Sequence, residues 1–569
     1  MAALIDRARD HYRAGHKDEA AALYQQILEQ DPDHLEALLL AALLLLDGAQ
    51  PAAAEPLLRR YRALDGGNPH AHQALGKLLQ DRGDDGEAVA HFKAAIVCRP
   101  EFPTGYTDLG LSLHRLYYRE TALHRFNRAT VLDPDFAGAH FHRGLILVEK
   151  SQLKEAALAF RRVLVREPDW AEGWFHLGTA CTDPAKAEAA FKRAIRIDPD
   201  CRMAYLQLAY LCEGGQRDSE ARQYLLESIR RAGVAVEPCI SANQAPRVLL
   251  IGGAGGCNVP TQALFDRRRF STVTVHLLPQ DEAGPEQATL AEHLPVCDIA
   301  FNAIADMDGG EALLTEVEGL CARLPIPLLN APAGLRPTRR DRAPRLLAGI
   351  PGLVVPVTER LDRQALAAMT VDQPLLVRPL ASHGGQDLVR IDSKQELANL
   401  LARLSGDWFY VTQYFDYRSA DGWYRKYRLI FVDRQVFPYH LAIARHWLIH
   451  YFRAEDMKTV ALLRREEEEF LSDWRSVFAG ERAAVIEEVA RRLDLDYAGI
   501  DCGLTQEGRV VLFEANANML VKLDESIETF PYKHRTVPRI FDAIDAMVAR
   551  RLNAKSSDCE IGRPQKYPD

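Results

Sequence analysis

Two consecutive stretches decide the fold of the first half of the chain: PTGYTDLGLSLHRLYYRETALHRFNRATVLDPDF at residues 103–136 and AGAHFHRGLILVEKSQLKEAALAFRRVLVREPDW at residues 137–170. Small, bulky and helix-ending residues recur at equal offsets in both, as Gly110, Phe126 and Pro134, then Gly144, Phe160 and Pro168. A period of 34 residues predicts a repeated unit of two helices. Small residues let the paired helices approach, and proline ends the second helix because it cannot continue the hydrogen-bond ladder.

The same pattern extends outward on both sides. Gly76, Phe92 and Pro100 lie one period earlier, whereas the following unit has lost three residues between its helices and ends at Pro199. We therefore predict seven repeats over residues 1–234, with boundaries at 1–34, 35–68, 69–102, 103–136, 137–170, 171–201 and 202–234. The second and seventh repeats are degenerate, because Gly66 and Gly233 stand near the position of the terminal proline.

This array resembles the tetratricopeptide repeat family, whose repeats stack into a superhelix with a concave groove. The positions expected to face the groove are mixed polar and apolar: Gln73, Lys77, Thr107, Leu111, Phe141, Leu145, Phe175 and Thr179. A carboxylate clamp needs lysine and asparagine together at these positions, and this combination is not present. The groove either packs on the second half of the chain or holds a protein or peptide partner with a partly apolar surface.

Composition narrows the classes of partner. The chain has 569 residues and a net charge of −9, which gives no reason to expect nucleic acid or an anionic membrane. The ten cysteines are scattered and form no zinc-finger spacing, so we expect reduced thiols in a cytoplasmic protein. The N-terminus reads as an amphipathic helix and not as a signal peptide.

The pattern changes after residue 234. We expect a linker at 235–246, followed by α/β alternation at 247–335 with a parallel sheet. The glycine cluster at 252–256 lacks the third glycine of a dinucleotide fingerprint, because Asn258 occupies that position, and the chain contains no Walker A motif.

The most informative segment of the second half is an expected hairpin. Its strands are YAGIDCGL at 497–504 and VVLFEANAN at 510–518, with polar residues at their ends. Alternation places Asp501, Glu514 and Asn516 on one face. Oxygen ligands on one face suit Mg²⁺, which takes its remaining ligands from water and substrate phosphates.

The G-I-D…F-E-A-N pair resembles the metal-binding hairpin of the ATP-grasp superfamily, which includes glutathione synthetase and D-alanine–D-alanine ligase. Two further segments extend the resemblance. In Arg378-Pro-Leu-Ala-Ser382-His383-Gly384-Gly385, the family's small-residue loop would cover the ATP phosphates and Arg378 would touch the α-phosphate. Arg378 and Arg342 stand where the family usually has lysine, and Arg342 would be a second phosphate-directed cation.

The third segment, at 408–416, resembles the strand whose end meets adenine. Gln413, Tyr414 and Phe415 would line that pocket by family analogy. Further along, the resemblance implies catalytic cations at three positions, Lys426, Arg428 and Arg445. Alternation puts Lys426 and Arg428 on one strand face. His446 and His450 are four apart, but we place them in a loop and expect no zinc site there.

The two resemblances imply a multidomain protein: an all-α superhelix, a pre-ATP-grasp α/β subdomain at 247–335 and an α+β ATP-grasp domain at 336–552. The polar composition of residues 553–569 predicts a disordered tail. The ATP-grasp resemblance implies an ATP- and Mg-dependent carboxylate–amine ligase acting through an acyl phosphate, with the repeats recruiting a protein or peptide. The alternative is a repeat scaffold whose nucleotide-binding half has lost catalysis. Phosphoryl transfer to an acceptor other than a carboxylate would use the same residues.

Overall fold

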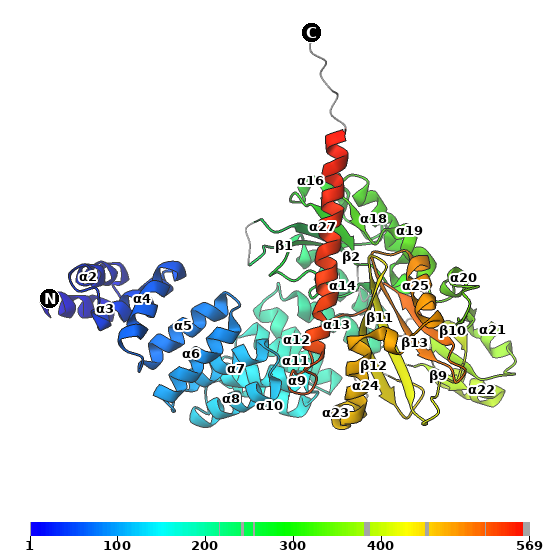
Figure 1. Cartoon of the computed structure of the whole chain (residues 1–569), viewed down its shortest axis with the longest axis horizontal. Coiled ribbons are helices and arrows are strands. Elements are labelled where there is room, and N and C mark those ends of the chain that lie inside the picture. The colour runs from blue at the N-terminus through cyan, green and yellow to red at the C-terminus, as the bar shows by residue number, and fades with distance from the viewer. Residues whose placement is uncertain are drawn as a thin grey trace, which may run out of the picture. The chain divides into compact units, whose positions relative to one another are not determined.

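The computed structural model describes residues 2–215, 217–240, 244–253, 257–380, 387–404, 406–449, 455–517 and 519–561. The chain divides into two compact units. The first comprises Met1–Ser228 with Ser526–Glu528, and the second comprises Ile229–Glu525 with Thr529–Asp569. Figure 1 colours the chain by residue number, and we describe each unit by itself.

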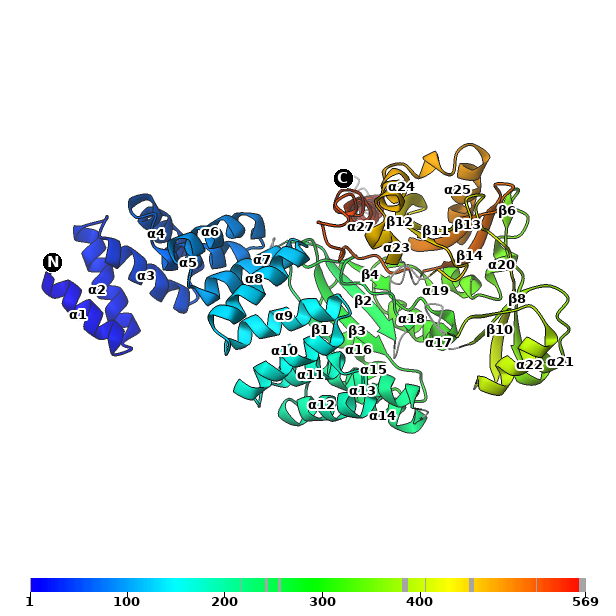
Figure 2. The same cartoon turned by 90° about the horizontal axis from the view of Figure 1, so that it is seen from below.

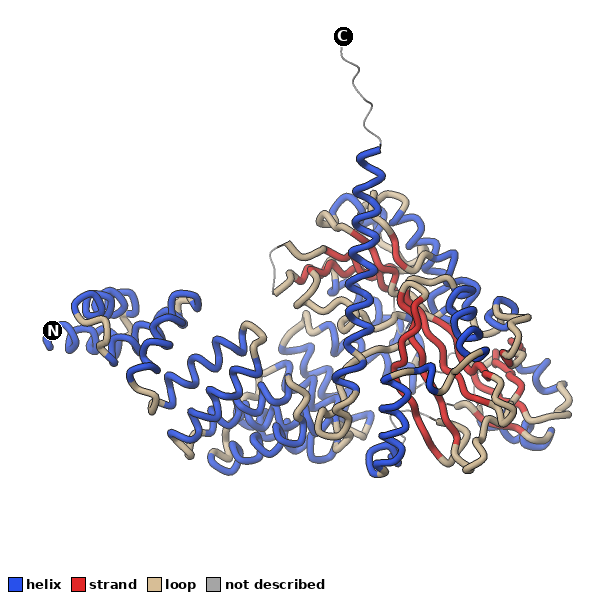
Figure 3. The backbone as a smooth tube through the Cα atoms, viewed as in Figure 1, coloured by secondary structure: helices blue, strands red, loops and turns tan. Residues whose placement is uncertain are grey.

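The first unit is helical, with two helices inside each predicted repeat window (Figure 3). The helix pairs are α1 Ala2–Arg13 with α2 Lys17–Gln30, α3 Leu35–Asp47 with α4 Pro51–Leu64, α5 Pro69–Asp81 with α6 Asp85–Cys98, α7 Pro103–Arg115 with α8 Arg119–Leu132, α9 Ala137–Glu149 with α10 Leu153–Arg166, α11 Ala171–Ala180 with α12 Pro184–Ile197, and α13 Arg202–Gly214 with α14 Asp218–Ala232. Helix α14 crosses the boundary between the units. The helix α11 is short because this repeat has lost three residues.

In each of the middle repeats, the recurring glycine of the first helix packs against the recurring phenylalanine of the second helix. A Cβ atom added to Gly144 on α9 would lie 2.6 Å from Cε1 of Phe160 on α10. The same contact recurs at 2.6 Å between Gly110 and Phe126. The phenylalanine rings are fully buried, so the absence of a side chain on glycine creates the space that each ring fills.

The described residues of the second unit form three sheets. The strands are β1 Ala235–Glu237, β2 Arg247–Gly253, β3 Ser271–Leu277, β4 Ile299–Asn302, β5 Leu328–Leu329, β6 Leu353–Val354, β7 Thr358–Asp362, β8 Leu375–Pro379, β9 Val389–Ile391, β10 Trp408–Gln413, β11 Tyr424–Val432, β12 Gln435–Ala444, β13 Tyr497–Leu504 and β14 Val510–Asn516. The first sheet has the order β1-β3-β2-β4-β5, the second β7-β10-β8-β9 and the third β12-β11-β13-β14-β6. The first sheet is parallel apart from β1, whereas the second is antiparallel.

The helices of the second unit lie between these strands in the sequence. They are α15 Pro285–Ala288, α16 Leu290–His293, α17 Met307–Gly310, α18 Leu314–Cys321, α19 Pro332–Leu335, α20 Ala343–Leu346, α21 Arg363–Ala368, α22 Lys394–Arg403, α23 Glu455–Thr459, α24 Ala461–Ser472, α25 Glu481–Leu493, α26 Lys533–Thr536 and α27 Pro538–Ile561. Short 3-10 turns lie at Glu311–Leu313, Arg336–Thr338 and Trp474–Ser476. Figure 2, turned from the view of Figure 1, separates α21 and α22, beside the second sheet, from α24 and α25, beside the third.

One buried asparagine joins the first sheet to the third. Asn330 follows β5 and has a φ of 53°, in the left-handed region that asparagine tolerates better than most residues. Its side chain donates to the carbonyl of Tyr497 at 2.8 Å and accepts from the amide of Tyr497 at 2.9 Å. The two sheets therefore share one continuous core within this unit.

The structure differs from the expected boundaries at two places. Part of the expected linker at 235–246 is the edge strand β1, which pairs antiparallel with β3. The expected disordered tail begins inside a helix, because α27 continues to Ile561. In both places the sequence is polar or short, so no hydrophobic period marks the element. No helix in the described part of the chain is long and apolar enough to cross a membrane.

Candidate functional site

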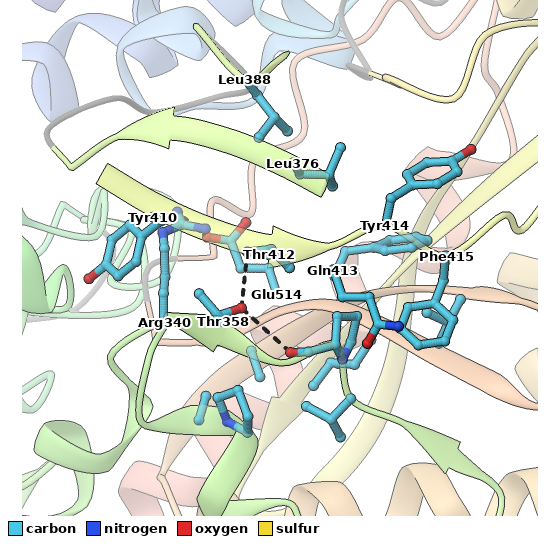
Figure 4. A pocket seen from close by; sticks show the side chains of 18 of the residues that line it. Arg340, Thr358, Leu376, Leu388, Tyr410, Thr412, Gln413, Tyr414, Phe415 and Glu514 are labelled. Atoms are coloured by element: carbon cyan, nitrogen blue, oxygen red, sulfur yellow. Dashed lines mark hydrogen bonds and ion pairs between the residues drawn. The ribbon is translucent and has the colours of Figure 1, made fainter. Parts of the chain in front are cut away.

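A cleft in the second unit is lined by side chains from the second and third sheets. Its empty volume, including open solvent at the mouth, is about 1140 Å³. The lining residues are Thr338, Arg340, Ala343, Pro344, Val355, Pro356, Thr358, Leu376, Arg378, Leu388, Tyr410, Thr412, Gln413, Tyr414, Phe415, Tyr417, Lys426, Trp447, Leu448, Ile449, Val511, Leu512, Phe513, Glu514, Ala515 and Asn516. In Figure 4, Arg340, Tyr410 and Glu514 lie on one side, whereas Gln413, Tyr414 and Phe415 lie on the other.

The apolar end of the cleft is formed where β10 ends. Gln413, Tyr414 and Phe415 line it, as the sequence predicts for a base-binding pocket. The backbone here is fixed by neighbouring segments: the Gln413 amide donates to the Val357 carbonyl at 3.1 Å, and the Tyr414 amide to the Pro374 carbonyl at 3.0 Å. The Tyr414 ring meets Trp447 edge-on at 5.8 Å.

The polar end carries two arginines. Arg378, on β8, is 8% exposed, and burial together with the neighbouring Arg340 lowers the pKa of its guanidinium to about 10. Arg340 donates to Oε1 of Glu514 at 2.7 Å. Lys426 also lines the cleft, and the cations among the lining residues suit an anion.

Glu514 and Asn516 are two residues apart on β14 and both line the cleft. Asn516 Nδ2 donates to Glu514 Oε1 at 2.8 Å. Burial alone would raise the pKa of Glu514, but Arg340 and Arg428 lower it, so the net shift is downward and the carboxylate is ionised. Nowhere among the described residues do three or more His, Cys, Asp or Glu side chains gather as a metal site. One carboxylate and one amide still fit Mg²⁺, which takes its other ligands from phosphates and water.

Asp501 differs from the expected arrangement. Its carboxylate is held by Arg428, whose Nε and Nη2 lie 2.6 Å and 2.9 Å from its oxygens, and by Lys426 Nζ at 2.9 Å. Burial would raise the pKa of Asp501, but the two cations hold it far below its usual range. Lys426 and Arg428 share one strand face, because both reach the carboxylate of Asp501. This carboxylate therefore already has two cationic partners.

Two expected cations lie elsewhere. Arg342 donates to Glu311 at 2.5 Å and to the carbonyl of Arg336 at 3.3 Å, and Arg340 lines the cleft instead. The segment after the turn at Arg336–Thr338 is not yet helical, so periodicity could not fix which arginine faces inward. The guanidinium of Arg445 stacks on Trp423, 4.2 Å from the ring centroid.

Several expected residues cannot be placed. Ser382, His383, Gly384 and Gly385 lie outside the described residues, as does His450. Nδ1 of His446 accepts a hydrogen bond from the Leu448 amide at 3.1 Å, within a loop.

Sequence reasoning missed two polar groups of the second sheet. The Tyr410 hydroxyl donates to Asp308, and the Thr358 and Thr412 hydroxyls bond to each other at 3.0 Å across β7 and β10. The strand β7 was not expected, so its pairing with β10 could not be inferred. Tyr410 lies in the strand whose end the family resemblance assigns to adenine, and alternation with Thr412 along β10 is the signal that places both on one face.

Comparison with known proteins concerns the first unit. The tetratricopeptide repeat model matches residues 5–69, 39–106, 119–178 and 182–235. No sequence among the curated proteins matches the chain. Among solved structures, the chain is similar to MamA from Desulfovibrio magneticus RS-1, with 19% identity, a TM-score of 0.28, and coverage of 29% of this chain and 94% of that one.

Two further structures are of the same kind. YrrB, described as a repeat protein with an unusual peptide-binding site, has 24% identity, a TM-score of 0.29, and coverage of 32% of this chain and 97% of that one. Pseudomonas aeruginosa pilF has 17% identity, a TM-score of 0.32, and coverage of 35% and 91%. The helix pairs and the matched residues together show that the N-terminal region of this chain is built of tetratricopeptide repeats, followed by a mixed α/β region with several sheets.

Proposed function

We propose that the second unit is an ATP- and Mg-dependent carboxylate–amine ligase of the ATP-grasp type, and that the repeats recruit its protein or peptide substrate. One observation carries the proposal. Arg378, Gln413 and Glu514, which the sequence analysis assigns to phosphate, base and metal, line a single cleft although they are far apart in the chain.

The two ends of this cleft differ in the way that a nucleotide requires. The end at Tyr414 and Phe415 is aromatic and suits a base, which has an apolar face. The end at Arg340 and Arg378 is cationic and suits phosphates, since guanidinium groups bind phosphate oxygens in pairs. ATP lying along the cleft would place its γ-phosphate toward Glu514 and Asn516.

The proposed reaction has two steps. A substrate carboxylate oxygen attacks the γ-phosphorus and ADP leaves; an amine then attacks the acyl carbon and inorganic phosphate leaves. Mg²⁺, when bound by Glu514 and Asn516, would neutralise charge on the phosphates. Arg340 and Arg378 would hold phosphate oxygens of the bound nucleotide and so stabilise the charge that develops during the transfer. Arg428 and Lys426, fixed by Asp501, would keep positive charge beneath the site.

Binding is the first test, because it needs no knowledge of the substrates. Titration calorimetry with the ATP analogue AMPPNP and Mg²⁺ should give a dissociation constant in the micromolar to millimolar range. Glu514→Ala should weaken this binding, whereas Glu318→Ala should not, because Glu318 pairs with Arg336 outside the cleft lining. No binding at millimolar AMPPNP would end the proposal. ADP release that needs both an added acid and an added amine would establish the ligase.

The alternative function is a repeat scaffold whose second unit binds a nucleotide without catalysis. Two observations favour the scaffold: Arg445 stacks on Trp423, and Asp501 is paired with both Lys426 and Arg428. One variant distinguishes the scaffold from the ligase. In Glu514→Ala, a scaffold keeps its partner and its biological role, whereas a ligase keeps the partner and loses the role.

A further inference from the structure

Glu514 already carries a cation where a metal would sit. Arg340 Nη2 and Asn516 Nδ2 both donate to the same oxygen, Oε1, at 2.7 Å and 2.8 Å. All three side chains line the cleft, and Figure 4 shows Arg340 and Glu514 side by side at its polar end. The guanidinium therefore occupies the carboxylate face that the proposed metal needs.

The surroundings of this ion pair disfavour a metal ion that arrives alone. Mg²⁺ would have to replace Arg340 on Glu514, which would separate an ion pair of 2.7 Å. Asp501 offers no second carboxylate, because Arg428 and Lys426 already engage both of its oxygens. A metal ion that arrives alone would therefore compete with Arg340 for Glu514, and separating this partly buried ion pair costs free energy.

A polyphosphate reverses this balance. Its oxygens would give the displaced Arg340 new partners and the metal further ligands, and would leave Glu514 Oε1 to the metal. We infer that Arg340 is a stand-in cation that blocks the metal position of Glu514 until a nucleotide draws its guanidinium away, so that metal and nucleotide each strengthen the binding of the other. This inference rests on the proposed function, since it takes the nucleotide to occupy the same cleft.

The coupling has a measurable consequence. Because linkage is reciprocal, AMPPNP must raise Mn²⁺ affinity by the same factor by which Mn²⁺ raises AMPPNP affinity, and we expect about 5- to 150-fold. Mn²⁺ binding to the full-length chain can be followed by electron paramagnetic resonance, with Mn²⁺ alone and with saturating AMPPNP. This wild-type comparison needs no variant and is independent of catalysis.

A pair of variants tests the role of Arg340 itself. Arg340→Met should raise the affinity for Mn²⁺ alone by about tenfold or more, because it leaves Glu514 open to the metal. Arg336→Met is the matched control, since Arg336 pairs with Glu318 away from the cleft lining, and should leave Mn²⁺ binding unchanged. Arg340→Met combined with Glu514→Gln should lose the gained binding.

The outcomes separate the inference from the proposed function. Tight Mn²⁺ binding to the wild type without nucleotide, at the affinity seen with AMPPNP, would overturn the inference alone. An Arg340→Met chain that melts as the wild type does and gains no Mn²⁺ binding would overturn it as well. A chain that binds no AMPPNP with or without Mn²⁺ would overturn the proposed function and, with it, the inference.

Discussion

Arg428 and Asp501 face each other across the neighbouring strands β11 and β13, and the guanidinium meets both carboxylate oxygens, at 2.6 Å and 2.9 Å. The Asp501 side chain is 3% exposed, and Lys426 completes the group at 2.9 Å. The three charges form one buried unit in which a single carboxylate serves two cations. This arrangement makes Asp501 a structural partner of the cations beneath the cleft.

Asp501→Asn should therefore destabilise the second unit strongly. It leaves Lys426 and Arg428 without a counterion in a buried place, and breaking such a pair costs about 3–5 kcal/mol. Urea unfolding followed by circular dichroism measures the loss. Asp421→Asn is the control, because Asp421 pairs with Arg425 and its side chain is 49% exposed, where a salt bridge contributes about 0–1 kcal/mol. Equal losses in the two variants would contradict this account.

Around Asp501, the sequence predicts the features that depend on local pattern but not those that depend on which strands pair. The hairpin at β13 and β14 follows from two apolar runs with polar ends, so its strands were foreseen within a few residues. The pairing of Asp501 with Lys426 and Arg428 was not, because it depends on β11 lying next to β13, a long-range neighbour relation. Alternation showed that the two cations share a face but not which carboxylate they meet.

The same limit applies to the arginine cluster after residue 335. The sequence singles out Arg342, but the residue that reaches Glu514 is Arg340. Neither helix nor strand period runs through this turn, so only the folded chain decides which side chain points inward. In the repeats the opposite holds. The period of 34 residues fixes the Gly144–Phe160 contact, because each repeat meets only its neighbours.

Gly144→Ala should destabilise the repeat array although alanine is the better helix former. The added Cβ would lie 2.6 Å from Cε1 of the fully buried Phe160, and overpacking of this kind costs about 1–3 kcal/mol. Gly138→Ala on the same helix is the control, since its nearest neighbour is 3.7 Å away and helix propensity should stabilise by about 0.5–1 kcal/mol. Opposite signs in urea unfolding are expected, and equal signs would refute the packing argument.

Acid should weaken the array through two stacked histidines. His142 lies against Phe126 at 5.6 Å and His176 against Phe160 at 5.5 Å, both nearly parallel. Burial lowers the pKa of each imidazole to about 4, with His114 and Arg115 adding to the effect at His142. In the unfolded chain each imidazole has a pKa of about 6.5, so the unfolded chain binds more protons between about pH 6.5 and 4. The free energy of unfolding therefore decreases as the pH is lowered through this window.

The expected loss is about 1–2 kcal/mol per histidine at pH 5 relative to pH 7.5. Hydrogen exchange of the α9–α12 amides in the full-length chain measures it locally. His176→Phe cannot be protonated and should show a smaller loss over these helices. A variant that loses as much protection as the wild type between the two pH values would show that His176 does not carry the effect.

Asn330 should be replaceable by neither alanine nor glycine without cost, but for different reasons. Asn330→Ala removes the hydrogen bonds to Tyr497 and places an L side chain at a φ of 53°, which together should cost about 2–5 kcal/mol. Asn330→Gly also loses the side-chain hydrogen bonds, but it removes the backbone strain. Glycine should therefore be the milder change in urea unfolding, and the reverse order would exclude strain as a contributor.

Arg378 offers the most direct test of the polar end of the cleft. Its guanidinium is buried beside Arg340, and burial together with that like charge lowers its pKa to about 10, which still leaves it cationic at neutral pH. Loss of a charge-assisted contact to phosphate costs about 1.5–3 kcal/mol, so Arg378→Met should weaken AMPPNP binding about 10- to 100-fold. Calorimetry at fixed Mg²⁺ measures the change. Arg360→Met is the control, because Arg360 stacks on Trp408 at 4.9 Å, away from the cleft lining.

Adenosine, which has no phosphate, should bind wild type and Arg378→Met equally, since its base would meet only Gln413, Tyr414 and Phe415. An equal loss for AMPPNP and adenosine would mean that Arg378 shapes the cleft and does not bind phosphate.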